Sequence, residues 1–192
     1  MLFVGSFRHI PNLEAIEWFV ERVLPLILER KPDARLVVAG SDPPPRGLFA
    51  KATRAVELLG FVEDIRTELA CREVFVCPIL SGSGVRVKLL EAFASGIPVV
   101  STYIGAEGLA RKDGEFCFLA DDPAAFADRV MRLFANPEKG LELAAAAREE
   151  VMANWDMRAI TAKLVASYRR ALEKNGAPTR DHSLESVAPG AD

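Results

Sequence analysis

Short, continuous apolar runs alternate along the chain with longer segments whose apolar positions recur every three or four residues. The short runs are rich in Val, Leu and Phe and predict buried strands, whereas the longer period predicts amphipathic helices. The predicted strands are residues 2–6, 34–40, 56–60, 73–80, 98–102 and 116–120. The predicted helices are residues 12–30, 46–54 and 65–71, one that follows residues 81–84 and ends at Gly96, and then 122–135, 138–153 and 157–174.

The alternation of strands and helices indicates a parallel sheet covered by helices on both faces. We therefore predict a doubly wound, Rossmann-like α/β domain over residues 1–174. Asn12 is expected to cap the first long helix, and Gly96 to terminate the helix that precedes Pro98. Residues 175–192 lack periodicity and are rich in Pro, Gly, Ser and Asp, so we expect them to form a disordered tail.

The composition narrows the class of protein without identifying it. Of the 192 residues, 50% are hydrophobic and 27% are charged, as in an ordinary soluble domain. The net charge of −3, with Lys and Arg scattered among Asp and Glu, provides no basic surface for nucleic acid. No apolar run approaches the roughly 20 residues of a membrane-spanning helix, although peripheral membrane contact stays open. Cys71, Cys77 and Cys117 show no paired spacing, which argues against disulfides and favours a cytoplasmic location.

The strongest candidate for chemistry is the stretch SGSGVRVKLLEA, residues 81–92. A glycine-rich loop that leads into a helix exposes unpaired amides at the positive end of the helix dipole, which suits a phosphate group. Arg86 and Lys88 are expected in the first turn, where positive charge opposes the dipole unless an anion is bound. We therefore predict that this loop and the two cations bind a diphosphate.

Helical spacing predicts that one polar face carries Gly84, Lys88, Glu91 and Ser95. Another face, which can pack on the sheet, carries Val85, Leu89 and Phe93. The polar face combines an anion site, a cation and a carboxylate that can accept hydrogen bonds from sugar hydroxyls, and these together suit a nucleoside diphosphate. The alternative is that Lys88 and Glu91 form only a surface ion pair, which would stabilise the helix by a few tenths of a kcal/mol.

Other catalytic signatures are missing from the sequence. It contains no Walker-type motif, no GxGxxG after the first strand and no GxSxG nucleophile elbow. It has no Asp-x-Asp pair, and we expect no metal site. His9 and His182 are the two histidines; His9 follows the first strand and can face the ligand edge, although a solvated loop histidine is the simpler interpretation.

The segment CPILSGSGVRVKLLEAFASGIPVVST, residues 77–102, resembles the signature of the carboxyl-terminal, donor-binding domain of family 4 retaining glycosyltransferases. Residues 3–44 are similar to the start of that domain, residues 56–78 to its middle and residues 154–172 to its final helix. The resemblance covers residues 2–174 and implies one half of the two-domain GT-B fold. It implies transfer of a sugar from a nucleotide-diphosphate sugar to an acceptor, with retention and without a metal ion or other cofactor.

The resemblance also implies roles for individual residues. Glu91 matches the glutamate that holds the ribose of the nucleotide, and Lys88, together with Arg86, would neutralise the leaving diphosphate. Arg8 is the candidate cation in the loop after the first strand. The remaining candidates for nucleotide binding are Gly5 in the first glycine loop, Gly60, Phe61 and Val62 beside the nucleobase, and Ser81, Gly82, Ser83 and Gly84 beside the diphosphate.

The chain departs from the family pattern at two places. Ser83 stands where the family usually has a glutamate that contacts the transferred sugar, so the donor sugar stays open. Many members carry an Arg and a Lys after the first strand, whereas residues 6–12 here offer Arg8 alone. The base of the nucleotide, UDP-type or GDP-type, is also not distinguished.

The family's acceptor site belongs to an amino-terminal domain that this chain does not contain. A glycan, a lipid or a small molecule would be the acceptor, and we expect the isolated domain to bind nucleotide weakly and to transfer nothing. Three other functions stay open. They are a non-catalytic nucleotide-sugar-binding module, a nucleotide-sugar epimerase of the same architecture, and a phosphate-sensing or regulatory α/β domain.

Overall fold

The computed structural model describes residues 1–44, 46–49 and 54–174. The chain forms two compact units, Met1–Met152 and the residues from Ala153 onward. The first unit contains the sheet and the predicted site. The prediction of a single domain over residues 1–174 stays a prediction, and the predicted tail, residues 175–192, lies outside the described residues.

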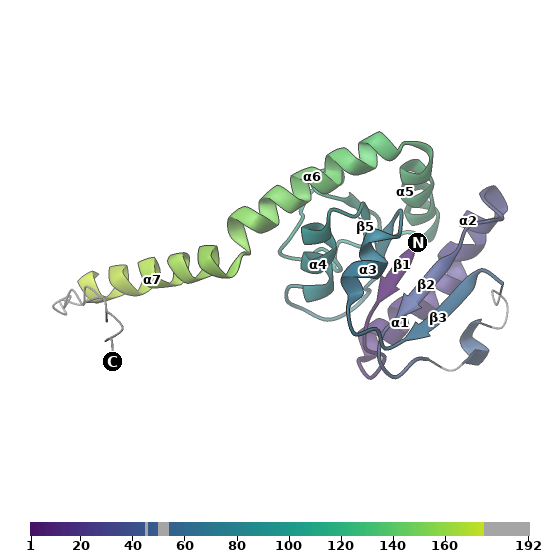
Figure 1. Ribbon diagram of the computed structural model, residues 1–192, viewed down its shortest axis with the longest axis horizontal. Coiled ribbons are helices and arrows are strands. Elements are labelled where there is room, and N and C mark those ends of the chain that lie inside the picture. Colours follow the sequence, from purple (N-terminus) through teal and green to yellow (C-terminus); the bar gives the residue numbers. More distant parts are fainter. Residues whose placement is uncertain (45, 50–53, 175–192) are drawn as a thin grey trace, which may run out of the picture. The chain divides into compact units, whose positions relative to one another are not determined.

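A six-stranded parallel sheet forms the centre of the first unit (Figure 1). Its spatial order is β3-β2-β1-β4-β5-β6, so the direction of winding reverses between β1 and β4. The strands are β1 Leu2–Val4, β2 Leu36–Ala39, β3 Val56–Gly60, β4 Phe75–Cys77, β5 Val99–Ser101 and β6 Phe118–Leu119. All six lie within the predicted strand segments, and the predicted parallel α/β sheet is confirmed.

Helices cover both faces of this sheet (Figure 1). One face carries α1 Ile10–Trp18, the π-helical turn η1 Phe19–Val23, α2 Leu24–Arg30 and α5 Pro123–Ala135. The other face carries α3 Ile65–Ala70 and α4 Val87–Ser95. The side chain of Phe126 on α5 holds the first group together, because its ring packs edge-on against Trp18 at 5.7 Å and Phe19 at 5.8 Å between centroids.

The helix predicted over residues 12–30 is a continuous helical run, but its start and its middle differ from the prediction. Pro25 has no N–H with which to continue the α-helical hydrogen bonds. The turn that precedes Pro25 is a wider π-helical turn, in which the Leu24 amide donates to the Phe19 carbonyl. The run begins at Ile10 with His9 at the N-cap position. The prediction that Asn12 caps the helix is therefore wrong, and its side chain lies buried inside the first turn.

The helix after the glycine-rich loop also begins later than predicted. Arg86 occupies its N-cap position with an extended backbone, so Gly84 and Val85 lie in the preceding loop and do not extend the helix faces. Leu89 and Phe93 are buried as predicted. Gly96 ends the helix at φ 77°, a left-handed conformation that glycine adopts without strain, and this predicted terminator is confirmed.

The remaining elements are a 3₁₀ turn and two long helices. The turn, η2 Arg46–Phe49, stands at the start of the helix predicted over residues 46–54, and residues 50–53 lie outside the described part. The helices are α6 Pro137–Asn154 and α7 Met157–Lys174. All residues of α7 are at least partly exposed. Among the helices of the described residues, none has the length and hydropathy that a bilayer crossing requires.

Candidate functional site

The site predicted from the sequence lies where the strand order reverses. The loops that follow β1 and β4 leave the carboxyl edge of the sheet on either side of this reversal. In open parallel sheets, ligands bind in the crevice that such diverging loops create. The loop after β1 contributes Gly5, and the loop after β4 contributes residues 81–85 and leads into α4.

Lys88, in the first turn of α4, extends across to the loop after β1. Its Nζ donates a hydrogen bond of 2.5 Å to Oδ1 of Asn12 and lies 4.7 Å from the centre of the Phe3 ring. Removal from water lowers the pKa of Lys88 below the ordinary lysine value, because burial penalises the charged form. Within the described residues Lys88 has no carboxylate partner, so the predicted alternative of a surface ion pair with Glu91 is not formed.

Gly5 allows the loop after β1 to approach this lysine. A Cβ at Gly5 would lie 2.8 Å from Cγ of Asn12 and 3.0 Å from Nζ of Lys88. The first distance is shorter than any real contact of a Cβ atom, so a side chain here would displace the Asn12 amide. The absence of a side chain at this position is therefore a requirement of the site.

The glycine-rich loop after β4 has a backbone that favours glycine at two positions. Gly82 has φ 96° and Gly84 has φ 88°, both in the left-handed region. The Gly84 amide donates a hydrogen bond of 3.2 Å to Oε2 of Glu107. The Ser81 hydroxyl donates one of 2.8 Å to Oε2 of Glu14. One amide of the predicted anion site is thus already bonded to a carboxylate of the protein.

Arg86 folds back onto this loop. Its Nη1 donates to the carbonyl oxygens of Ser83 at 2.7 Å and Gly84 at 3.0 Å, and its Nη2 lies 3.4 Å from the Ser81 carbonyl. Its Nε is buried and has no hydrogen-bond partner in the part of the chain that the structure describes. In this conformation Arg86 braces the loop through its carbonyl oxygens and leaves one buried donor for another group.

Glu91 lies one turn after Lys88 on α4. Its side chain is exposed, and its carboxylate forms no hydrogen bond or ion pair with the residues described. It is therefore available to accept hydrogen bonds from a ligand.

A cavity of about 220 Å³ lies at the carboxyl ends of β1, β2 and β3. It brings together three residues that the sequence predicted for nucleotide binding, Gly5, Phe61 and Val62. Phe61 is 76% exposed, and Gly60 before it has φ 71°. The amide of Gly40 donates to the Gly60 carbonyl at 2.7 Å, which links the carboxyl ends of β2 and β3.

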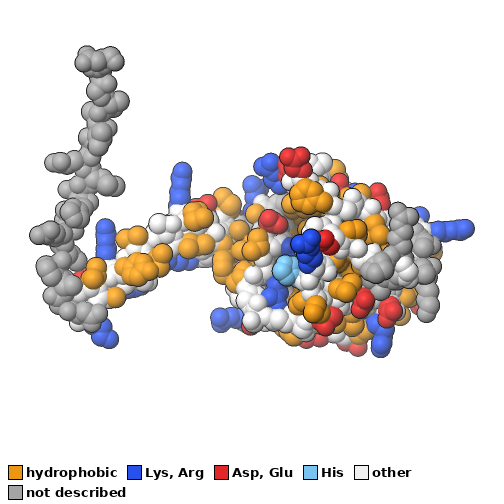
Figure 2. Space-filling view, turned by 90° about the horizontal axis from the view of Figure 1, so that it is seen from below, with side chains coloured by type: hydrophobic (Ala, Val, Ile, Leu, Met, Phe, Trp, Pro, Cys, Tyr) orange, Lys and Arg blue, Asp and Glu red, His pale blue; other side chains and the backbone are white. Residues whose placement is uncertain are grey.

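Arg8, the predicted cation of the first loop, forms an ion pair with Asp42 at 3.0 Å and is 80% exposed. Solvent-exposed pairs of this kind stabilise little, so the pairing leaves Arg8 able to exchange partners. Figure 2 shows, on one face of the larger unit, a His side chain beside Lys or Arg and Asp or Glu side chains, with apolar side chains around them.

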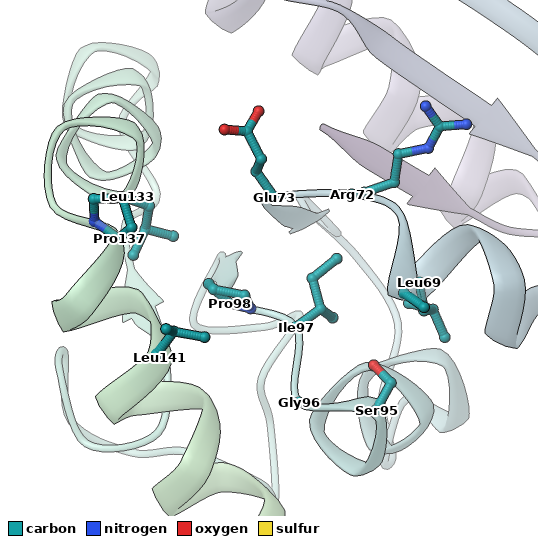
Figure 3. Close-up of a pocket in the computed structure, with 11 residues that line it drawn as sticks. Leu69, Arg72, Glu73, Ser95, Gly96, Ile97, Pro98, Leu133, Pro137 and Leu141 are labelled. Atoms are coloured by element: carbon teal, nitrogen blue, oxygen red, sulfur yellow. The ribbon is translucent and has the colours of Figure 1, made fainter.

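A second cavity, of about 290 Å³, lies away from the predicted site (Figure 3). Ile97 and Pro98, which precede β5, lie between Leu69 of α3 and Leu141 of α6 in the close-up. Because these residues lead into strands, this cavity is at the amino edge of the sheet. No residue that the sequence predicted for nucleotide binding lines it.

Asn12 and Glu107 contact candidate site residues, and neither was among the residues predicted for nucleotide binding. Asn12 carried a signal, because it occupies the buried stripe of α1 that continues through Ala15 and Ile16, where a polar side chain needs a partner. Glu107 carried none, since its contact with Gly84 joins two loops that are distant in sequence. Within the described residues, no three His, Cys, Asp or Glu side chains gather closely enough to hold a metal ion.

Comparison with known proteins identifies relatives of the chain. A family described as "Glycosyl transferases group 1" matches residues 1–136. The chain is 28% identical over 170 residues to the "Uncharacterized 44.6 kDa protein in cps region" of Klebsiella pneumoniae, a match that covers 83% of this chain and 43% of that protein. It is 31% identical over 160 residues to the "Lipopolysaccharide core biosynthesis mannosyltransferase LpsB" of Rhizobium meliloti, covering 72% of this chain and 45% of that protein. The chain thus spans less than half the length of these curated relatives.

A solved structure shares the fold. It is the C-terminal domain of a glycosyl transferase group 1 family protein, LpcC from Francisella tularensis, with a TM-score of 0.68 and 20% sequence identity. The match covers 81% of this chain and 86% of that one. At this level of identity the likeness concerns the fold, and it agrees with the predicted Rossmann-like architecture.

Proposed function

The chain belongs to the glycosyl transferases of group 1, and from that premise we propose that it is the donor-binding half of a glycosyltransferase. In this role it holds a nucleoside-diphosphate sugar at the carboxyl edge of its sheet. The sugar passes to an acceptor with retention of configuration and without a metal ion. The likeness to a C-terminal domain of the same family supports this assignment to one half of the enzyme.

The observation that carries the proposal is the position of Lys88. Its ammonium lies at the reversal of the strand order, partly buried, and the residues described provide a neutral amide and an aromatic ring as neighbours but no carboxylate. A diphosphate brings the missing negative charge. When the sugar leaves, that charge grows, and a cation fixed in a poorly hydrated site stabilises it more than water does.

The other groups fit the remaining parts of the donor. The cavity beside Phe61 takes the nucleobase, and the free carboxylate of Glu91 accepts hydrogen bonds from the ribose. The diphosphate binds at the loop of residues 82–84 and exchanges with the carboxylate of Glu107 at the Gly84 amide. The buried Nε of Arg86 is a further donor for a phosphate oxygen.

The relatives narrow the donor sugar and leave the acceptor open. LpsB of Rhizobium meliloti is named a mannosyltransferase, which favours a hexose donor here as well. Ser83, in place of the family's glutamate, removes one carboxylate from the neighbourhood of the sugar. The acceptor, a glycan, a lipid or a small molecule, binds to the part of the enzyme that lies beyond this chain.

Calorimetric titration of this chain with UDP, GDP and ADP tests the proposal, and uridine, guanosine and adenosine isolate the contribution of the diphosphate. We expect one nucleoside diphosphate to bind best, and Lys88→Ala and Glu91→Ala each to weaken it by about tenfold or more, as expected for hydrogen bonds to charged groups. Lys112→Ala and Glu149→Ala, at exposed positions elsewhere, serve as matched controls. Failure of all three nucleotides to bind would refute the proposal.

Ser83 favours a second candidate, a module that binds a nucleotide sugar without transferring it. Transfer assays with the chain joined to the remaining part of the enzyme separate the two. Sugar transfer supports the glycosyltransferase, whereas binding of the donor without turnover supports the module.

A further inference from the structure

We propose that Asn12 is a positioning residue that holds Lys88 for the diphosphate and keeps its positive charge uncompensated. The inference rests on the proposed function and adds to it a residue that has no contact with the ligand. The inference rests on the hydrogen bonds of the buried Asn12 side-chain amide, which connects three segments of the chain.

Asn12 is 9% exposed, and both ends of its side-chain amide are used. Its Nδ2 donates to the Ser6 carbonyl at 2.7 Å, and its Oδ1 accepts from Nζ of Lys88 at 2.5 Å. The orientation of the amide follows from its partners, because a carbonyl oxygen can only accept and an ammonium can only donate. Asn12 therefore links the loop after β1, the start of α1 and the first turn of α4.

The neutrality of Asn12 matters more than its packing. An ammonium has three N–H donors, and in the described residues Lys88 uses one of them, toward Oδ1 of Asn12. The face of Phe3 adds attraction without a formal charge. The lysine is thus held in place by groups that do not neutralise it, and its charge stays available to an anion.

The charged and titratable groups near Lys88 agree with this arrangement. Cys77 on β4 is buried, and burial raises the pKa of its thiol, so it remains neutral at ordinary pH. Arg86 repels the ammonium and lowers the pKa of Lys88 further. An aspartate at position 12 would instead place a carboxylate where the amide oxygen is, raise the pKa of Lys88 and compete with the diphosphate.

Two substitutions at this position test the inference through the pH dependence of nucleotide binding. Affinity for the best nucleoside diphosphate falls as pH rises through the pKa of Lys88. Asn12→Asp moves this fall to higher pH and weakens the diphosphate contribution by about tenfold near neutral pH. Asn12→Ala removes the acceptor, lowers the pKa of Lys88 and moves the fall to lower pH. Binding of the parent nucleoside stays unchanged in both variants.

A structural role alone predicts another result. If Asn12 contributes only packing, both variants lose stability, but the pH at which nucleotide affinity falls stays the same. The affinities for nucleoside and nucleotide then change together. That outcome would overturn the inference, as would unchanged nucleotide affinity in Asn12→Asp. If Asn12→Asp fails to fold, the shift in Asn12→Ala alone decides. Absence of nucleotide binding by the unmodified chain, by contrast, would refute the proposed function itself.

Discussion

Glu107 accepts a hydrogen bond of 3.2 Å from the backbone amide of Gly84, so a carboxylate of the protein occupies a donor of the glycine-rich loop. The two residues come from different loops, one after β4 and one after β5. A carboxylate imitates a phosphate oxygen in charge and in hydrogen bonding. In the proposed function, the Glu107 carboxylate therefore competes with the diphosphate for the Gly84 amide.

Replacing Glu107 by Gln is expected to strengthen nucleotide binding. The amide side chain is a weaker acceptor and carries no charge to repel the diphosphate, so we expect affinity to rise about threefold to tenfold. Titration calorimetry with the best nucleoside diphosphate measures the change. Glu149→Gln, at an exposed position on α6, should leave affinity unchanged. Equal or weaker binding by Glu107→Gln would show that the carboxylate does not compete.

The lowered pKa of Lys88 makes stability depend on pH. Between its pKa in the folded chain and the ordinary lysine value of 10.5, the unfolded chain binds more protons than the folded chain, so the free energy of unfolding rises with pH. Wild type should therefore gain stability relative to Lys88→Met as pH rises toward 10.5. Urea unfolding of both proteins at a series of pH values measures the difference. Lys112→Met, at an exposed position, should show no such trend, and a flat difference for Lys88→Met would contradict the prediction.

A side chain at Gly5 should damage the site more than the fold. The added Cβ of Gly5→Ala would lie 2.8 Å from Cγ of Asn12 and displace both that amide and Lys88. We expect a loss of about 1–3 kcal/mol in the free energy of unfolding and a loss of about tenfold in nucleotide affinity. Gly47→Ala is the matched control, because its Cβ would meet nothing within 4 Å. Unaltered nucleotide affinity in folded Gly5→Ala would argue against the role of this close approach.

Phe61 should contribute to binding of the base and not of the diphosphate. Its exposed ring lines the cavity at the carboxyl edge and offers a surface on which a base can stack. Loss of such stacking weakens binding by about 1–3 kcal/mol. Phe61→Ala should therefore weaken a nucleoside and its diphosphate equally, whereas Lys88→Ala should weaken the diphosphate alone. Leu141→Ala, in the cavity at the opposite edge, is the control. Different losses for nucleoside and nucleotide in Phe61→Ala would place the base elsewhere.

The architecture was predictable from the sequence because the spacing of apolar residues reflects which side of each helix or strand is buried. Short runs of mainly apolar residues marked all six strands, and Gly96 marked the end of α4 through the left-handed conformation that helix termination uses. Both features are determined by residues that are close together in the sequence. The boundaries that differed, at Asn12 and Arg86, depend on backbone angles at helix starts, which several residue types adopt equally well.

Part of the grouping of the candidate residues was predictable from the sequence, but their contacts were not. Gly5 and Phe61 line one cavity at the carboxyl edge, and Lys88 and Glu91 lie one turn apart on α4. That these residues bind a nucleotide stays a prediction. The hydrogen-bond partner of Lys88 is Asn12, which lies 76 residues away in sequence. No local sequence pattern connects these two residues. Helical spacing offered Glu91 as the partner instead, and the fold provided a different one.

The guanidinium of Arg86 ties the start of α4 to the carbonyl oxygens of the loop that leads into it. These hydrogen bonds restrict movement of the loop relative to the start of α4, and Lys88 lies on the same helix two residues after Arg86. We therefore expect a displacement of the glycine-rich loop to be accompanied by a displacement of Lys88.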